Sequence, residues 1–270
     1  MSPRPTWHEP LSRRTNGLAE EGTHSMKWLA ATSAAVVTLI LLSVFFGTTE
    51  PSATLLAAQA APPDAVAADP ARYSVLYEND VAQMIRVKYQ AGARSVMHSH
   101  PAGCAIFYKD AALKVTSSTG EVRTRHYRAG DVSCGDGNSH ITENVGPDTE
   151  FVQVHLKNRK TFDHLQTGRS LVYPARIKAP DPIDADPAHY FVQFENDVVR
   201  LARIKVPGGV KTPMHAHLAY CIVEIRDMET GVKAGDSSCG NAMAHESPNN
   251  AKSVNEAITI EFKNRDSFKP

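Results

Sequence analysis

The sequence predicts an all-β protein in which two tandem domains, each a sandwich or jelly roll of short strands, follow an apolar N-terminal helix. Three observations predict this fold class. Most of the chain beyond the N-terminal region occurs twice, apolar and polar residues alternate with a period of two in several segments, and glycine-containing turns separate those segments. Neither copy has a segment with the periodicity of an amphipathic helix. Many short strands with frequent turns are typical of two packed sheets.

The N-terminal helix is predicted over residues 28–47. The run from Trp28 to Phe46 has no charged side chain and is long enough to cross a hydrocarbon core of about 30 Å. Basic residues precede it, so the positive-inside rule keeps the tail 1–27 in the cytoplasm and exports the rest. Two interpretations stay open: an uncleaved membrane anchor with periplasmic domains, and a signal peptide cleaved near Ala58-Gln59-Ala60 that leaves a soluble periplasmic protein. Both place the two domains outside the cytoplasm, in the cell envelope.

An internal repeat organises the remaining chain. The segment Met97-His98-Ser99-His100 returns as Met214-His215-Ala216-His217 at an offset of 117, which neighbouring blocks share. His140 returns as His245 at an offset of 105, so the second copy lacks twelve residues, about one hairpin arm and a turn. Two units make a tandem duplication and not a solenoid. The predicted order is an Ala- and Pro-rich linker at 48–68, a first copy at 69–160, a second linker at 161–185 and a second copy at 186–267.

Alternation also predicts which faces of the strands are buried. The run from Val152 to Leu156 alternates, with Gln153 and His155 on its polar face, which is the pattern of a half-buried strand. The polar face of such a strand is expected to meet solvent. His155 is therefore predicted to be solvated, as is Glu261, which has the same place in the second copy.

The His-x-His pairs are the strongest candidates for chemistry. Residues two apart in a strand project from the same face, so the two imidazoles of each pair can bind one metal ion. A histidine from the later matched block supplies a third nitrogen. Imidazole suits zinc, copper, iron and nickel, and three protein ligands leave positions open for water or substrate. The candidate metal ligands are His98, His100, His140, His215, His217 and His245.

These residues lie in a longer pattern. Gly-x5-His-x-His begins at Gly92 and Gly209, and Gly-Asp followed by His-x3-Asn begins at Gly130 and Gly235. The pattern resembles the two motifs of the cupin superfamily, in both copies and over about 69–264. The resemblance implies a double-stranded β-helix jelly roll in each copy, hence a two-domain cupin. It also implies that the histidines bind a divalent transition metal (iron, copper, nickel, zinc or manganese) inside a β-barrel.

The pattern departs from the family at its carboxylate. The family has a glutamate three or four residues after the second histidine, where this chain has Cys104 and Ala105, and Cys221 and Ile222. This weakens the analogy to manganese oxalate oxidases and decarboxylases, whereas cupin-like thiol dioxygenases with iron use three histidines. An ion held by neutral ligands keeps its full charge, so such a site would favour a small anionic or chelating substrate.

The four cysteines are two matched pairs. In jelly rolls the strand after His-x-His runs beside the strand that begins with Gly-Asp, so the resemblance implies Cys104–Cys134 and Cys221–Cys239 disulfides. An even count in an oxidising compartment favours them. The alternatives are that Cys104 and Cys221 act as thiolate ligands or redox groups, or that the thiols are free and buried.

Composition narrows the function classes. The 29 basic and 29 acidic residues give a formal net charge of zero, so no basic excess points to a nucleic-acid partner. The sequence predicts an exported bicupin that is a metal-dependent oxygenase (dioxygenase-like) or isomerase-like enzyme acting on a small molecule. The alternative is a non-catalytic small-ligand or metal-binding module of the cell envelope. Further partners would be the membrane, through the N-terminal segment, and other copies in a homo-oligomer; no catalytic acid or base is identified.

Overall fold

The computed structural model of the chain describes residues 61–162 and 171–269. The predicted cytoplasmic tail, the apolar segment 28–47 and most of the first linker lie outside the described residues. No helix within the two described ranges is long and apolar enough to cross a membrane. The described part is almost entirely β, as predicted.

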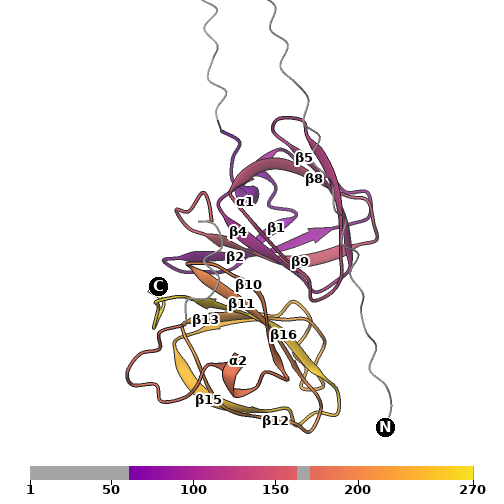
Figure 1. The fold of residues 1–270 in the computed structure, drawn as a ribbon. Coiled ribbons are helices and arrows are strands. Elements are labelled where there is room, and N and C mark those ends of the chain that lie inside the picture. The colour runs from indigo at the N-terminus through magenta and orange to yellow at the C-terminus, as the bar shows by residue number, and fades with distance from the viewer. Residues whose placement is uncertain (1–60, 163–170, 270) are drawn as a thin grey trace, which may run out of the picture. The chain divides into compact units, whose positions relative to one another are not determined.

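Nine strands and a one-turn helix make up the first copy (Figure 1). One sheet has the order β1-β2-β9-β4-β7 and a second has the order β3-β8-β5-β6. The elements are α1 (Ala65–Ala68), β1 (Tyr73–Glu78), β2 (Ala82–Tyr89), β3 (His98–His100), β4 (Gly103–Phe107), β5 (Ala111–Ser117), β6 (Val122–Tyr127), β7 (Val132–Gly135), β8 (Asn138–Asn144) and β9 (Thr149–Leu156).

The second copy repeats this order without the β5–β6 hairpin. Its five-stranded sheet, β10-β11-β16-β13-β14, matches that of the first copy, and its other sheet contains only β12 and β15. The elements are α2 (Pro182–Ala185), β10 (Tyr190–Glu195), β11 (Val199–Val206), β12 (Lys211–His217), β13 (Tyr220–Glu224), β14 (Ser237–Gly240), β15 (Met243–Pro248) and β16 (Asn255–Phe262). Asp64 and Asp181, which are 117 apart, accept backbone N–H bonds at the start of α1 and α2, so the structural repeat begins upstream of the strands.

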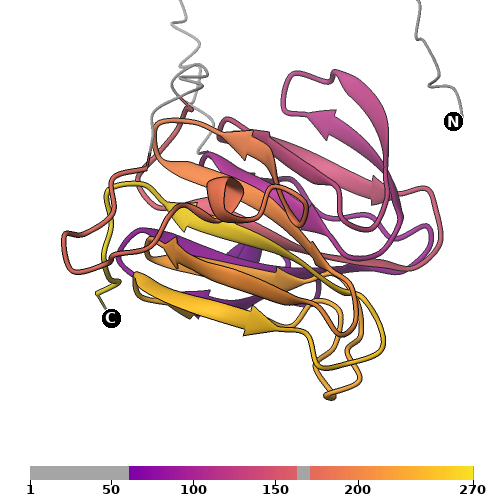
Figure 2. The ribbon, with the colours of Figure 1, turned by 60° about the horizontal axis from the view of Figure 1, so that its bottom comes forward.

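The predicted closed barrels are not found. Within the described residues the strands of each copy form two separate sheets, and each sheet keeps two edge strands. In the first copy the two sheets pack against each other through a core that joins Ile85 and Val87 of β2 and Phe151 of β9 to Leu113 of β5. Each copy is therefore a two-sheet sandwich of the jelly-roll type (Figure 2).

The largest core cluster joins the two copies. It combines Met84 and Val154 from the five-stranded sheet of the first copy with Leu201, Ile258 and Ile260 from that of the second. Burial of this apolar surface, at about 25 cal/mol per Å², favours a packed pair over two separate small domains. The apolar faces of β9 and β16 are thus covered by the sister copy, and the polar faces of these two strands turn to the interior of each sandwich.

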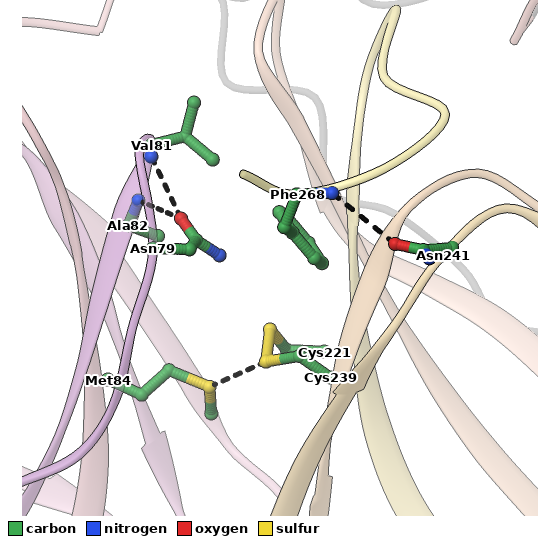
Figure 3. Close-up of a disulfide and its surroundings, with 8 residues drawn as sticks. All are labelled: Asn79, Val81, Ala82, Met84, Cys221, Cys239, Asn241 and Phe268. Atoms are coloured by element: carbon green, nitrogen blue, oxygen red, sulfur yellow. Dashed lines mark hydrogen bonds between the residues drawn. A yellow bond between two sulfur atoms is a disulfide. The ribbon is translucent and has the colours of Figure 1, made fainter. Parts of the chain in front are cut away.

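Polar contacts at this interface follow the repeat. Asp80 pairs with Arg265 at 2.7 Å, and the equivalent Asp197 pairs with Arg159 at 2.7 Å. Each copy thus contributes the same two groups, as in a two-fold interface between identical subunits. Figure 3 shows the second disulfide at this interface, where Cys239 Sγ lies 3.5 Å from Met84 Sδ. Neither sulfur carries a hydrogen, so this contact is packing.

Both disulfides implied by the resemblance are present. Cys104 is bonded to Cys134 across β4 and β7, and Cys221 to Cys239 across β13 and β14. None of the four cysteines is free. The alternative in which Cys104 and Cys221 are thiolate ligands is therefore wrong: both sulfurs are consumed in disulfides and both residues belong to the core between the copies.

Glu224 places a carboxyl group at the interior face of the second copy. Glu224, on β13, has the place that Phe107 has in the first copy, at the offset of 117. Its Oε2 atom is buried without a hydrogen-bond partner among the described residues. Burial, and to a lesser extent the charge of Asp236, raises the pKa of Glu224 to about 7.

Glu224→Gln is therefore expected to stabilise the protein by about 1–3 kcal/mol above pH 7, and to leave stability unchanged below pH 4.5. The carboxyl group titrates near 4.5 in the unfolded chain and near 7 in the folded one. Between these values the folded state binds more protons, so wild-type stability falls as the pH rises. Urea denaturation across this range measures the difference, with Glu246→Gln at an exposed carboxylate as the control. Equal stabilities of wild type and Glu224→Gln at pH 8 would contradict the raised pKa.

Candidate metal centre

The second copy brings its three candidate histidines together. His215 and His217 are two residues apart on β12, and His245 lies opposite His215 on the antiparallel strand β15. One ring nitrogen from each of the three lies within 4.8 Å of the other two. His215 and His217 are buried. Three converging imidazoles are the donor set that zinc, copper, iron and nickel accept.

The contacts of the Nδ1 atoms determine which nitrogen of each histidine is available to a metal ion. His215 Nδ1 donates to the carbonyl oxygen of Pro213 at 2.7 Å, and His217 Nδ1 donates to Glu261 Oε1 at 2.8 Å. His245 Nδ1 lies 3.4 Å from Ser247 Oγ. With Nδ1 engaged in this way, Nε2 is left as the nitrogen that can offer a lone pair to a metal.

His245 Nε2 shows that the donors fit a metal ion. It is buried and has no hydrogen-bond partner among the described residues. Buried polar atoms are nearly always partnered, so such an atom requires an explanation. A divalent cation shared with His215 and His217 would satisfy it.

A buried carboxylate supports this centre from behind. Glu261, on β16, is fully buried and was predicted to face solvent; that prediction was wrong, because the apolar face of β16 packs on the first copy and its polar face points inward. Its Oε1 accepts from His217, and its Oε2 accepts from Arg200 Nε at 2.8 Å. Arg200 also donates to Asp181 at 2.7 Å. A carboxylate that fixes the tautomer of a ligating histidine is common in metal sites.

The first copy arranges its histidines more loosely. His98 lies opposite His140 across β3 and β8, with ring centroids 4.8 Å apart, and the ring centroids of His100 and His140 are 5.0 Å apart. Their Nδ1 atoms are bonded to Val96 O, Pro101 O and Asn138 Oδ1, so Nε2 is again the available nitrogen. Among the described residues, however, only the second copy brings three such nitrogens within 4.8 Å of one another.

His155 belongs to this first-copy cluster. It was predicted to be solvated, but it is only 6% exposed, and its ring stacks on His100 at 5.2 Å with an interplanar angle of 19°. His155 Nε2 lies 3.2 Å from Gln153 Oε1. The prediction failed because both faces of β9 are buried: the apolar face meets the second copy and the polar face meets the cavity. His155 is the positional equivalent of Glu261, so the two copies differ in chemistry at one matched place.

Burial favours the neutral form of an imidazole, which is the form that can act as a ligand. It is the largest cause that lowers the pKa of His98, His100 and His215. Burial and the neighbouring imidazoles lower the pKa of His140 to about 3 and that of His245 to about 4. The same causes lower the pKa of His155 to about 3.

Two tyrosines that the sequence analysis did not assign also reach the histidines. Tyr73 Oη lies 3.2 Å from His98 Nε2, and Tyr190 Oη lies 3.1 Å from His215 Nε2. Because each Nδ1 already donates to a carbonyl, the phenol is the donor. An ion at these nitrogens would take the lone pair and release the phenol hydrogen to another acceptor. Tyr73 and Tyr190 share the offset of 117 with the histidines, which was the signal available in the sequence.

The remaining motif residues are structural. Gly92 and Gly209 have φ angles of 74° and 77°, which only glycine adopts readily. Asn144 Nδ2 donates to the carbonyl of Pro147 at 2.7 Å, and Asn249 Nδ2 donates to that of Val206 at 2.9 Å. These residues hold the turns that bring the histidine strands together.

The cavities beside the histidines differ in size. The first copy has a cavity of about 440 Å³ that His100, His140 and His155 line, and the second has one of about 140 Å³ beside His217 and His245. The first is within the range for small-molecule sites, about 300–1,000 Å³, and the second is below it. The β5–β6 hairpin, which lines the first cavity, has no counterpart in the second copy.

No family model matches the chain, and no curated protein matches it. Its neighbours among solved structures include cupin domains and oxalate decarboxylases. A cupin domain from Bordetella pertussis Tohama I has a TM-score of 0.30 at 17% identity, covering 32% of this chain and 91% of that one. A cupin 2 conserved barrel domain protein from Leptotrichia buccalis has a TM-score of 0.43 at 8% identity, and the match covers 71% of this chain and 88% of that one. A deletion mutant of Bacillus subtilis oxalate decarboxylase has a TM-score of 0.44 at 13% identity, and the match covers 73% of this chain and 77% of that one. These likenesses concern the fold alone, and none carries an argument about function.

Proposed function

We propose that the chain is a two-domain cupin metalloprotein that binds a divalent transition metal through His215, His217 and His245. The observation that carries the proposal is the buried, unpartnered Nε2 of His245, which faces two further imidazoles whose Nδ1 atoms are already engaged. Pro213 O, Glu261 Oε1 and Ser247 Oγ contact the Nδ1 atoms and are placed as outer support for a ligand set.

In the first copy, His98, His100 and His140 would hold a second ion beside the larger cavity. The ion would supply Lewis-acid or redox chemistry to a bound small molecule. The protein's own contribution is to orient the bound small molecule and to enclose it in the cavity. Tyr73 holds a phenol proton beside His98 Nε2, and Phe151 and other apolar side chains exclude water from one wall. We therefore propose a metal-dependent oxygenase-like or isomerase-like activity for this copy.

The alternative is a module that binds a small ligand or a metal without turnover. The small cavity of the second copy and the looser histidines of the first favour it. Oxygen uptake and product analysis by mass spectrometry, on the metal-loaded protein with a bound ligand, discriminate the two: a ligand recovered unchanged supports the binding module.

We also propose that the two copies lie outside the cytoplasm, either anchored by residues 28–47 or released by cleavage. The two disulfides support this location, because structural disulfides are rare in the cytosol.

Cobalt(II) titration of the full-length chain, followed by visible absorption, tests the metal proposal. The wild type is expected to bind cobalt with the spectrum of a nitrogen-ligated ion, and His245→Ala is expected to lose the second-copy component. His126→Ala is the matched control, because His126 lies on β6 and is exposed. A wild type that binds no cobalt, zinc or iron would overturn the proposal.

A further inference from the structure

The β5–β6 hairpin presents two arginines to the first-copy cavity. Arg123 and Arg125 are two residues apart on β6, and both line the cavity together with His140. Residues at this spacing project from one face of a strand. The second copy has no such hairpin, so it has no equivalent of either arginine.

Neither guanidinium is held by a strong partner. Among the described residues, Arg125 makes no hydrogen bond or ion pair. Arg123 donates to Glu121 Oε1 at 2.7 and 2.9 Å, but the two side chains of this pair are 62% and 58% exposed. Solvent screens such a pair, so its guanidinium is available to a ligand.

The strand register sets the distance from the arginines to the histidines. Val115 of β5 lies opposite both Thr142 of β8 and Arg123 of β6, and Ser117 lies opposite His140. Arg123 is thus two strands across and two residues along from His140, which places their Cα atoms about 12 Å apart. Side chains from both ends shorten this gap to the length of a small molecule.

Apolar side chains make up much of the lining. Leu113 and Val115 belong to β5, the strand between β6 and β8, and Phe151 belongs to the facing sheet, while Tyr127 stacks on Phe107 at 4.0 Å beyond Arg125. Apart from Glu121 and the two arginines, polar side chains of the lining such as Asn138 and Gln153 contact the histidines. A ligand that matches this order has a metal-binding head, an apolar or aromatic body and an anionic tail.

We propose that Arg123 and Arg125 form an anion subsite, and that the first copy accepts an aromatic carboxylate whose opposite end chelates the metal. The planar guanidinium suits a carboxylate because it offers paired donors in a fixed geometry. The subsite deepens the proposed function and rests on it for the position of the metal-binding head. The acidic groups of the lining are Glu121, which pairs with Arg123, and Asp136, which accepts from Phe162 N at 2.7 Å; neither pairs with Arg125.

Binding of two matched probes to the metal-loaded full-length chain tests the subsite. The probes are 3,4-dihydroxybenzoate and its neutral analogue 3,4-dihydroxybenzamide, which share the chelating catechol and differ in the charge of the tail. The wild type is expected to bind the carboxylate about tenfold more tightly than the amide. Arg123→Gln/Arg125→Gln is expected to bring the two affinities within about twofold by weakening the carboxylate alone. Arg128→Gln, an exposed arginine outside the cavity lining, should keep the tenfold preference.

The outcomes separate this inference from the proposed function. Equal affinities for the two probes in a metal-loaded wild type would overturn the anion subsite and leave the metal proposal standing. If the chain retains no metal, the proposed function fails, and benzoate and benzamide replace the catechols. A preference for benzoate that the double variant abolishes would then still support the subsite, and its absence would overturn it.

Discussion

Glu261→Gln is expected to weaken metal binding in the second copy by about 10–100-fold and to destabilise the protein by about 2–4 kcal/mol. The carboxylate accepts on both oxygens, from His217 Nδ1 on one and from Arg200 on the other. An amide has one acceptor oxygen, so its NH₂ group must face one of these two donors. Either His217 loses the bond that orients it, or the buried Arg200 keeps only Asp181 as its partner.

The matched control is Glu246→Gln on β15. This carboxylate is 42% exposed and pairs with Lys211, so its loss is expected to change stability by no more than about 0.5 kcal/mol. Zinc competition titration and urea denaturation measure both effects. Metal affinity equal to that of the wild type in Glu261→Gln would show that the carboxylate does not support the centre.

Leu201→Asp is expected to cost at least about 4 kcal/mol and to unfold both copies together. Leu201 is fully buried in the core that joins the copies, beside residues of both five-stranded sheets. An aspartate there removes apolar contacts and buries a charge with no cation built to receive it. Because the core is shared, the damage is expected to reach β9 of the first copy as well as β16 of the second.

Hydrogen exchange read strand by strand measures this coupling, with urea denaturation for the total. Val192→Asp is the matched control, because Val192 is 44% exposed on the edge strand β10; its effect is expected to stay within about 1 kcal/mol. Loss of protection confined to the second copy would mean that the two copies fold independently.

The repeat made much of this architecture predictable. Matched offsets located the two copies, the paired histidines and the paired cysteines, and the disulfides formed as the jelly-roll resemblance implied. The His-x-His pairs were accessible because residues two apart in a strand share a face, whereas the disulfides depend on which strands are neighbours, which the resemblance implied. His98 lies opposite His140 and His215 lies opposite His245, and that either set binds a metal stays a prediction.

The faces of the last strand in each copy were not predictable in the same way. His155 and Glu261 lie on polar faces of alternating strands, which a single sandwich in water would expose. Here the apolar face of each strand is covered by the sister copy, so the polar face closes on the cavity. Alternation identifies two unlike faces but not which of them meets solvent, and only the packing of the copies decides that.

The central claim is that the histidine sets hold metal ions, and metal content by elemental mass spectrometry on the full-length chain tests it most directly. After loading and removal of free metal, the wild type is predicted to retain a transition metal, His245→Ala to lose the second-copy ion, and His98→Ala/His215→Ala to retain none. A wild type with no more metal than the double variant would contradict the account.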